Sequence, residues 1–259
     1  MEEYLLDDEA ARTAFLAEAA EIYRPRLQQL GMAPKDGESD DDRLLRGSLV
    51  GSFALWFEDP QVRAEMDKGG RAVLGLGGDG QLHADAVASD FRATALAVAL
   101  EEGGVAAFDA AEKHFRAAKD PVVRSQLLGA MGGVDDPALA ERARKLVLEP
   151  GVLRRNEIYA ILGGQVSERE TRAAARAWVD ANFDALAERV APGGASLASL
   201  YAAGMCSAQD AATLEARFGA RLKDMEGGPM ELKQTIEAIQ LCEAAREARR
   251  GQPLTFATK

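Results

Sequence analysis

Histidine, cysteine and aromatic residues are scarce in this chain, and their scarcity excludes several kinds of active site. There are only two histidines, His83 and His114. Neither belongs to an HExxH sequence, which would place two zinc ligands and a general base on one helix. We interpret both as surface or packing residues. A GxSxG sequence, the mark of many serine hydrolases, is absent as well, and no carboxylates are paired at catalytic spacing. We therefore expect no catalytic residue, no metal ligand and no cofactor in this chain.

The two cysteines, Cys206 and Cys242, are far apart and have no CxxC partner. Two cysteines in 259 residues are not typical of a disulfide framework or a structural zinc site. Because both lie on apolar helix faces, we expect buried free thiols and a reducing compartment. The N-terminus also lacks the basic and apolar regions of a signal peptide. The prediction is a cytoplasmic protein, with a periplasmic location as the alternative if a longer parent carries a signal upstream.

Basic charge and long apolar runs are lacking too. The formal net charge is -11 and the isoelectric point is near 4.9. A phosphate backbone or an anionic membrane surface would need a basic face on the protein. No segment approaches the ~20 consecutive apolar residues that cross a bilayer. These features predict no nucleic acid partner and no membrane partner.

What the chain has instead is a strong helical pattern. Hydrophobic residues make up 47% and charged residues 28%, the balance of a globular protein. An Asp-Pro pair recurs at predicted helix starts, where aspartate accepts hydrogen bonds from the first amides and proline needs no acceptor. Between these starts, apolar residues recur every three or four positions. The three pairs are Asp59-Pro60, Asp120-Pro121 and Asp136-Pro137, and one clear apolar stripe is Leu45, Leu49, Phe53 and Trp56.

Glycine pairs fall at or near the ends of these stripes and predict helix stops, because glycine readily adopts the left-handed conformation that closes a helix. In the latter half they recur about every 30 residues, the scale of helix-hairpin repeats. We therefore predict an all-α fold of roughly a dozen helices. The architecture we expect is a HEAT-like array of antiparallel helix pairs, an α-solenoid with a concave bowl, forming one domain over residues 1–259. The pairs are Gly103-Gly104, Gly132-Gly133, Gly163-Gly164, Gly193-Gly194 and Gly227-Gly228.

Two segments interrupt the helical rhythm. Residues 34–42 are polar and acidic and predict an exposed loop between the first two helices. Residues 69–83 are rich in glycine and predict an irregular corner. Within that corner residues 75–80 match GxGxxG, but a dinucleotide site needs a strand before this sequence, and none is evident.

One charged cluster stands out at a predicted helix start. Arg154, Arg155 and Glu157 follow a Pro-Gly turn. If this helix start faces a concave surface, the arginines can bind a carboxylate or a partner loop. The simpler interpretation is a solvated helix start with local ion pairs worth about 0–1 kcal/mol. We retain all three as candidate peptide-binding or domain-contact residues.

Several sequence strings, taken in order, resemble the C-terminal helical domain of the aminopeptidase N and puromycin-sensitive aminopeptidase family, also called the endoplasmic reticulum aminopeptidase-like C-terminal domain. The resemblance runs from about Ala10 to Ala248 and rests on the order and spacing of the strings. They are YRPRLQQLG at 23–31, FD at 108–109, DPVVR at 120–124, DPAL at 136–139, LRRNE at 153–157, WVDANFDAL at 178–186 and EAIQLC at 237–242.

The resemblance implies a bowl of helix pairs that caps a zinc-dependent catalytic domain, encloses a cavity and restricts which peptides reach the metal. It implies that zinc is held by the parent's catalytic domain, and that the partners are that domain of the same polypeptide and the peptide substrate. The family's HExxH and Gly-Ala-Met-Glu-Asn motifs are absent from this chain. A C-terminal fragment of this kind should expose an apolar docking face, for which Phe15, Ile22 and Leu27 of the first helix are candidates.

The alternative is a stand-alone helical-repeat scaffold that binds a protein partner on its concave face. The two hypotheses differ in what precedes residue 1 in the source gene. A lid domain predicts an upstream reading frame with HExxH, whereas a scaffold predicts a frame that begins near Met1.

Overall fold

The computed structural model describes residues 9–250, and all regular secondary structure in that part of the chain is helical. There are twelve α-helices and two short 3-10 helices, and no strand lies within the described range. This result confirms the predicted all-α class and the expected number of helices. The α-helices are α2 (Glu9–Leu30), α3 (Asp40–Leu55), α4 (Pro60–Val73), α5 (Ser89–Ala117), α6 (Pro121–Gly132), α7 (Pro137–Leu148), α8 (Ile158–Ser167), α9 (Arg169–Ala181), α10 (Phe183–Val190), α11 (Leu197–Tyr201), α12 (Ala208–Leu222) and α13 (Gly228–Arg249), and the 3-10 helices are η1 (Ala84–Ala86) and η2 (Gly193–Ser196).

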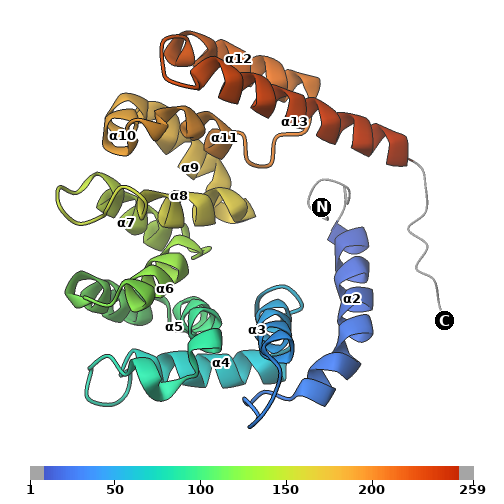
Figure 1. Cartoon of the computed structure of the whole chain (residues 1–259), viewed down its shortest axis with the longest axis vertical. Helices are drawn as coiled ribbons and strands as arrows, with labels where there is room; N and C mark the ends of the chain where they lie inside the picture. Colours follow the sequence, from blue (N-terminus) through green and yellow to red (C-terminus); the bar gives the residue numbers. More distant parts are fainter. Residues whose placement is uncertain (1–8, 251–259) are drawn as a thin grey trace.

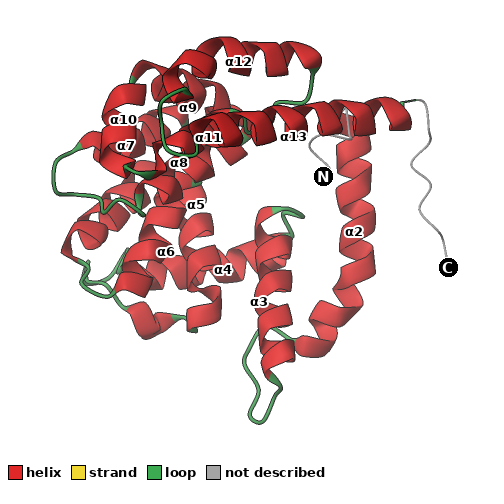
Figure 2. Ribbon diagram, turned by 45° about the horizontal axis from the view of Figure 1, so that its top comes forward, coloured by secondary structure: helices red, strands yellow, loops and turns green. Residues whose placement is uncertain are grey.

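The helices from α4 to α13 are stacked in chain order along an arc (Figure 1). Helices close in sequence pack together along this arc, as in α4 with α5, α5 with α6, α6 with α8, and α12 with α13. Helix α2 packs on α3 and stands across from the rest of the stack in both views (Figures 1 and 2). At its first residue, Glu9 forms a 3.3 Å ion pair with Arg169 at the start of α9. This exposed contact links α2 to the middle of the stack.

Helix α5 is continuous by hydrogen bonding but contains a sharp kink. Gly104 has φ 52° and ψ −134°, a backbone conformation that lies outside the helical region and favours glycine. The helices before and after it therefore run in different directions. The stop predicted at Gly103-Gly104 is confirmed.

The three Asp-Pro pairs begin helices as predicted. In α4, α6 and α7 the aspartate side chain accepts hydrogen bonds from the next two free amides, with N–O distances from 2.8 to 3.2 Å. Proline occupies the first helical position each time. Removing such a cap typically costs about 1 kcal/mol.

Two other glycine pairs allow a close approach between helices α6 and α8. Gly132 is the last residue of α6 and Gly164 lies inside α8, where the two helices cross at close range. A Cβ atom on Gly132 would lie 2.4 Å from the Ala160 carbonyl oxygen, and one on Gly164 would lie 2.5 Å from the Gly132 carbonyl oxygen. The stop predicted at Gly132-Gly133 is confirmed, since α6 ends at Gly132. The stop predicted at Gly163-Gly164 was wrong, because α8 continues to Ser167 and Gly164 serves the close approach of the two helix backbones.

The glycine-rich corner begins later than the sequence suggested. Gly69 and Gly70 belong to α4, and a Cβ atom on Gly70 would meet the Ala95 carbonyl oxygen at 2.0 Å. The corner proper follows Val73, where Gly75 has a positive φ of 65°. It is preceded by a helix and not by a strand, which agrees with its interpretation as a turn.

Apolar residues are buried in two clusters. The larger one extends from the end of α4 through α13, and the smaller one joins α2, α3, α4 and the first part of α5. Leu49 and Phe53 of α3 are buried in the smaller cluster, as their spacing predicts. Leu45 and Trp56 of the same predicted stripe are 38% and 62% exposed. That part of the prediction was wrong, since α3 ends at Leu55 and Trp56 leaves the helix face.

The segment 34–42 divides between a loop and a helix. Ser39 caps α3, so Asp40, Asp41 and Asp42 form its first turn, where carboxylates interact favourably with the helix dipole. The loop before it is largely exposed. Glu38 is the exception, because it forms an ion pair with the buried side chain of Arg46.

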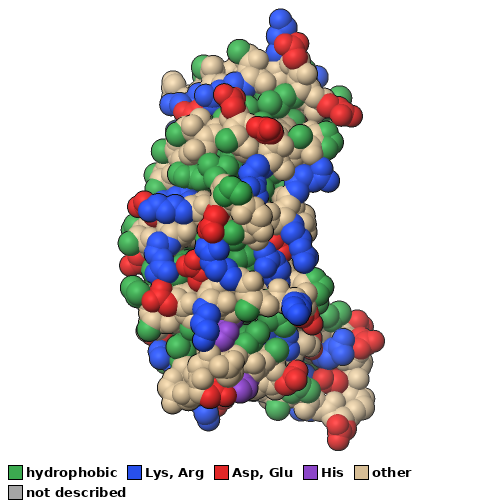
Figure 3. All heavy atoms as spheres, turned by 90° about the vertical axis from the view of Figure 1, so that its left-hand side faces the viewer, with side chains coloured by type: hydrophobic (Ala, Val, Ile, Leu, Met, Phe, Trp, Pro, Cys, Tyr) green, Lys and Arg blue, Asp and Glu red, His purple; other side chains and the backbone are tan. Residues whose placement is uncertain are grey.

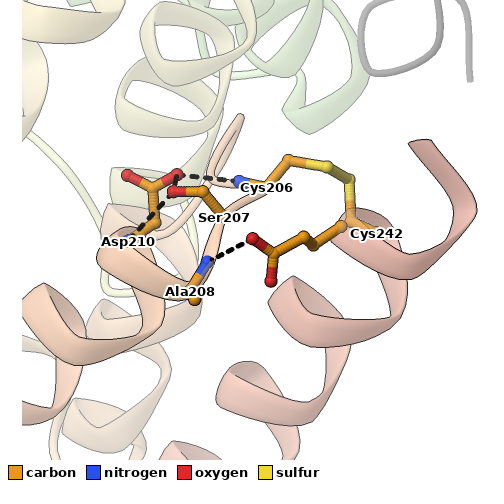
Figure 4. The surroundings of a disulfide bond; sticks show 6 residues. Cys206, Ser207, Ala208, Asp210 and Cys242 are labelled. Atoms are coloured by element: carbon orange, nitrogen blue, oxygen red, sulfur yellow. Dashed lines mark hydrogen bonds between the residues drawn. A yellow bond between two sulfur atoms is a disulfide. The ribbon is translucent and has the colours of Figure 1, made fainter. Parts of the chain in front are cut away.

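Cys206 and Cys242 form a disulfide, with their Cα atoms 5.2 Å apart (Figure 4). The prediction of two free thiols was wrong. Helices α12 and α13 form a hairpin, so the later part of α13 lies beside the start of α12 and two cysteines 36 residues apart are brought together. The spacing of the cysteines in the sequence does not predict this contact.

None of the described helices is long and apolar enough to cross a membrane.

Candidate functional site

The predicted cluster at Arg154 lies in a cavity lined by guanidinium groups. The loop between α7 and α8, together with the end of α5 and the first turns of α6, surrounds a space of about 330 Å³. This loop lies at the left of Figure 1, on the face that Figure 3 presents, where many Lys and Arg side chains are exposed. We call this cavity the arginine pocket; it is lined by Phe115, Arg116, Arg124, Gly151, Val152, Leu153 and Arg154.

A buried ion pair forms the inner wall of the arginine pocket. The Arg124 guanidinium donates to both carboxylate oxygens of Glu157, at 2.6 and 3.1 Å, and also to the Phe115 carbonyl oxygen at 3.1 Å. Its carbon atom lies 4.0 Å from the centre of the Phe115 ring, within the range of a cation–π contact. Both charged side chains are about nine-tenths buried. Arg124 is therefore fixed by contacts on several sides.

Glu157 also fixes the loop that precedes α8. Its carboxylate accepts a hydrogen bond from the backbone amide of Arg154 at 2.7 Å. Burial raises the pKa of Glu157, but the hydrogen bonds from Arg124 and from the Arg154 amide outweigh that effect and hold the pKa below its ordinary value. The carboxylate thus stays ionised as the internal counter-ion of Arg124.

The three residues singled out from the sequence have different environments. Glu157 is buried, whereas the Arg154 side chain is 60% exposed at the pocket and lies 3.9 Å from the Glu157 carboxylate. Arg155 points elsewhere and donates to the Ala191 carbonyl oxygen at 2.6 Å. Arg116 and Arg124 were not recognised as part of this site. The string DPVVR at 120–124 contained Arg124, but only the fold brings it opposite Glu157.

Carboxylates gather at the opposite end of α6. We call this group, Glu58, Asp67, Glu101, Glu102, Asp135 and Glu168, the acidic edge. The first five line a cavity of about 700 Å³ between the start of α4, the kink of α5 and the turn before α7. Because α6 has 12 residues, the acidic edge and the arginine pocket are separated by about 18 Å along the helix.

Two carboxylates of the acidic edge, Glu101 and Glu168, have raised pKa values, because the fold disfavours their ionised forms. Burial raises the pKa of Glu101 above its ordinary value, although Arg63 lies within 2.9 Å and opposes the shift. Burial and then repulsion from Glu170, Glu101 and Asp135 raise the pKa of Glu168. Arg63 bridges Glu101 and Glu102, and Arg71 donates to both carboxylate oxygens of Asp67, so these two arginines do not balance all six carboxylates. This region therefore has a negative field that favours positively charged groups.

Neither histidine adds a metal ligand to these regions. His83 is exposed and lies 2.8 Å from Asp79, while His114 is buried and lies 3.1 Å from the Leu74 carbonyl oxygen. These are a surface and a packing position, as expected. Among residues 9–250, no three histidine, cysteine or carboxylate side chains are grouped as metal ligands would be.

Comparison with known proteins identifies the domain family. The sequence profile of the ERAP1-like C-terminal domain matches residues 2–241, which is nearly the whole chain. A search of curated proteins gave no match. The matched range agrees with the resemblance seen in the ordered strings, and the helical structure agrees with the fold which that resemblance implies. The chain belongs to the family of ERAP1-like C-terminal domains, which are typical of zinc-dependent aminopeptidases of the M1 class.

Proposed function

We propose that this chain is the C-terminal lid domain of a zinc aminopeptidase, which encloses the active-site cavity and restricts the access of peptides without catalysing hydrolysis itself. The observation that carries the proposal is the family match over residues 2–241. The zinc and the reacting groups belong to a catalytic domain of the same polypeptide, and both domains contact the peptide substrate.

The arrangement of the helices supports this role. A stack that bends into an arc, with α2 standing across from it, provides the walls of a bowl (Figure 1). The acidic edge lies on the side of the stack where α9 meets α2 through Arg169 and Glu9. We propose that this edge faces the enclosed space, where its field favours peptides with basic side chains over acidic ones.

Two exposed groups are candidates for the contact with the catalytic domain. Ile22 and Tyr23 on α2 are 62% and 49% exposed, whereas Leu27 of the same helix is buried against its neighbours. Large apolar side chains left open in this way are typical of surfaces that dock another domain. Arg154 and Arg155 remain candidates for a second polar contact, with Glu157 fixing the backbone beneath Arg154.

The test begins with the source gene. The reading frame is followed upstream of residue 1, and we expect HExxH and Gly-Ala-Met-Glu-Asn sequences in it. The parent enzyme is then compared with a version lacking residues 1–259, using a short aminoacyl substrate and longer peptides. We expect the truncated enzyme to lose its discrimination by peptide length, and the isolated chain to bind no zinc and cleave neither substrate.

A second pair of variants addresses the two candidate contacts. In the parent enzyme, Ile22→Asp should weaken the association between the domains, and Arg154→Ala with Arg155→Ala should weaken it less. Lys145→Ala is the matched control, because Lys145 is 68% exposed and pairs only within its own helix. Turnover by the isolated chain, or a gene that starts at Met1 with no catalytic domain, would overturn the proposal in favour of a stand-alone scaffold.

The compartment stays a prediction. The sequence favours the cytoplasm, but disulfides form and persist mainly in oxidising compartments. The Cys206–Cys242 bond therefore supports the periplasmic alternative.

A further inference from the structure

We propose that the Cys206–Cys242 disulfide is a thiol-sensitive latch, which holds the outer half of α13 over an apolar groove and releases it when reduced. We call residues 240–249 the outer half of α13. The crosslink joins this part of the helix to a residue 36 positions earlier in the chain.

The two halves of α13 are attached to the rest of the molecule in different ways. The buried residues of this 22-residue helix are Gly228, Leu232, Thr235 and Ile239, all in its first half. Leu232 and Ile239 belong to the larger core cluster. After Ile239 no side chain of the helix is buried. The first half can therefore keep α13 in the fold while the outer half separates from its neighbours.

Two contacts join the outer half of α13 to the turn between α11 and α12 (Figure 4). One is the disulfide from Cys242 to Cys206. The other is the Glu243 carboxylate, which accepts a hydrogen bond from the Ala208 backbone amide at 2.9 Å, at the start of α12. On the other side of the turn, Asp210 holds the Cys206 amide at 3.0 Å. Cys206 is thus anchored to a rigid turn, and Cys242 is the movable partner.

An open groove adjoins the sulfur atoms. It lies between α11 and α13, has a volume of about 640 Å³ and is lined mainly by apolar side chains. Cys242 and its neighbours Ala238, Leu241 and Ala245 form the α13 wall, and Met205 lies on the opposite wall beside Cys206. Cys242 is only partly buried. A small thiol can approach the bond from this groove, and access is one of the factors that govern the rate of thiol–disulfide exchange.

The reaction needs a dithiol as the reductant. One thiolate of the dithiol attacks a sulfur of the Cys206–Cys242 bond, which breaks and leaves the other cysteine as a thiol after it takes up a proton. The second thiolate of the dithiol then attacks the mixed disulfide and frees the first cysteine. The chain gains two electrons and two protons as two thiols, and the dithiol is oxidised to its own disulfide. At the turn between α11 and α12, the Glu243 contact to Ala208 then remains.

Hydrogen–deuterium exchange of the full chain, with and without dithiothreitol, tests the latch. We expect amides in residues 240–249 to exchange about tenfold faster or more after reduction, as a locally opening segment does. Amides in α6 and α8 should be unchanged. A dye that fluoresces on apolar surfaces should bind more strongly to the reduced chain, because the groove has lost one wall.

Variants separate the disulfide from the remaining contact. Cys242→Ser and Cys206→Ser should each exchange rapidly in residues 240–249 with or without dithiothreitol. Glu243→Gln keeps the crosslink and should remain slow until the reductant is added. Equal exchange in the oxidised and reduced chains would overturn the proposal. Faster exchange throughout α5–α9 on reduction would do so too, because the bond would then be a general staple of the fold. Free thiols in the untreated chain would also count against it.

Discussion

The arginine pocket and the acidic edge lie at the two ends of α6, and they handle buried charge in opposite ways. At the pocket, Glu157 has two hydrogen-bonding partners and a pKa below its ordinary value. At the edge, Glu101 shares one arginine with Glu102, and burial raises its pKa. At the pocket the buried charge of Glu157 is balanced by Arg124, whereas the carboxylates of the edge outnumber the arginines paired with them.

This difference assigns separate roles to the two ends of α6. A buried charge with a matched partner fixes the local backbone and adds little to the external potential. A crowded group of carboxylates destabilises the folded state slightly, and such a group persists where the charge is useful. We therefore assign structural support to Arg124 and Glu157, which is consistent with the proposal that the acidic edge selects ligands by their charge.

The largest expected effect is the loss of one partner of the buried pair. Arg124→Ala leaves the Glu157 carboxylate buried without its main counter-ion, which typically costs about 3–5 kcal/mol. Urea denaturation of the variant and the unmodified chain measures the change in the free energy of unfolding. If Arg124→Ala costs less than about 1 kcal/mol, the pair behaves like an exposed one and the contrast between the two ends of α6 fails.

A smaller effect is expected at the glycine that lets α6 and α8 approach. Gly132→Ala places a methyl group 2.4 Å from the Ala160 carbonyl oxygen, so the helices must separate, at a typical cost of about 1–3 kcal/mol. Gly163→Ala is the matched control, since a Cβ atom there meets nothing within 4 Å and alanine should stabilise the helix by up to about 1 kcal/mol. Thermal unfolding of both variants should show shifts of opposite sign.

The pH dependence of stability should differ in sign between the two regions. Glu101 binds its proton more tightly in the folded chain, so its contribution is fully present below its ordinary pKa of 4.5 and is lost as the pH rises through the raised value. Glu157 contributes stability above its ordinary pKa, and that stability is lost as the pH falls through the lowered value.

Glu101→Gln isolates the contribution of the acidic edge. Compared with the unmodified chain, this variant should gain stability as the pH rises through the window just above 4.5. Urea midpoints from about pH 4 to about pH 7 give the measurement. A difference that shrinks with rising pH would contradict the assigned direction.

The smallest effect is expected for Arg116, the partly exposed arginine of the arginine pocket. Arg116 pairs with Glu149 at 2.8 Å and with Glu112 at 2.9 Å, but its side chain is 38% exposed. Exposed pairs contribute about 1 kcal/mol or less, so Arg116→Ala should change the free energy of unfolding only slightly. A loss as large as that of Arg124→Ala would show that exposure does not separate the two arginines.

Much of the helical architecture followed from local sequence chemistry. The Asp-Pro pairs begin helices because both the cap and the proline act within one turn of the chain. The stop at Gly103-Gly104 was predicted for the same reason. Trp56 was misplaced because its spacing fits the stripe although the helix ends one residue earlier. Helix ends are the least certain part of any periodic pattern.

The candidate site was predicted only in part. Arg154, Arg155 and Glu157 were recognised as a charged group, but nothing within that segment indicated that Glu157 is buried or that Arg124 is its partner. Their contact joins residues 33 positions apart. The acidic edge was missed for the same reason, because its members come from α4, α5, the turn before α7 and the start of α9.

The all-α class and the helix starts could be predicted from the amino-acid sequence, because each depends on residues that act on their near neighbours, and the order of short strings indicated the family. The folded chain alone shows which charges are paired, which glycines lie at helix contacts and that Cys206 is bonded to Cys242. These outcomes depend on where distant segments meet. The same glycine or cysteine serves different purposes according to what the fold brings against it.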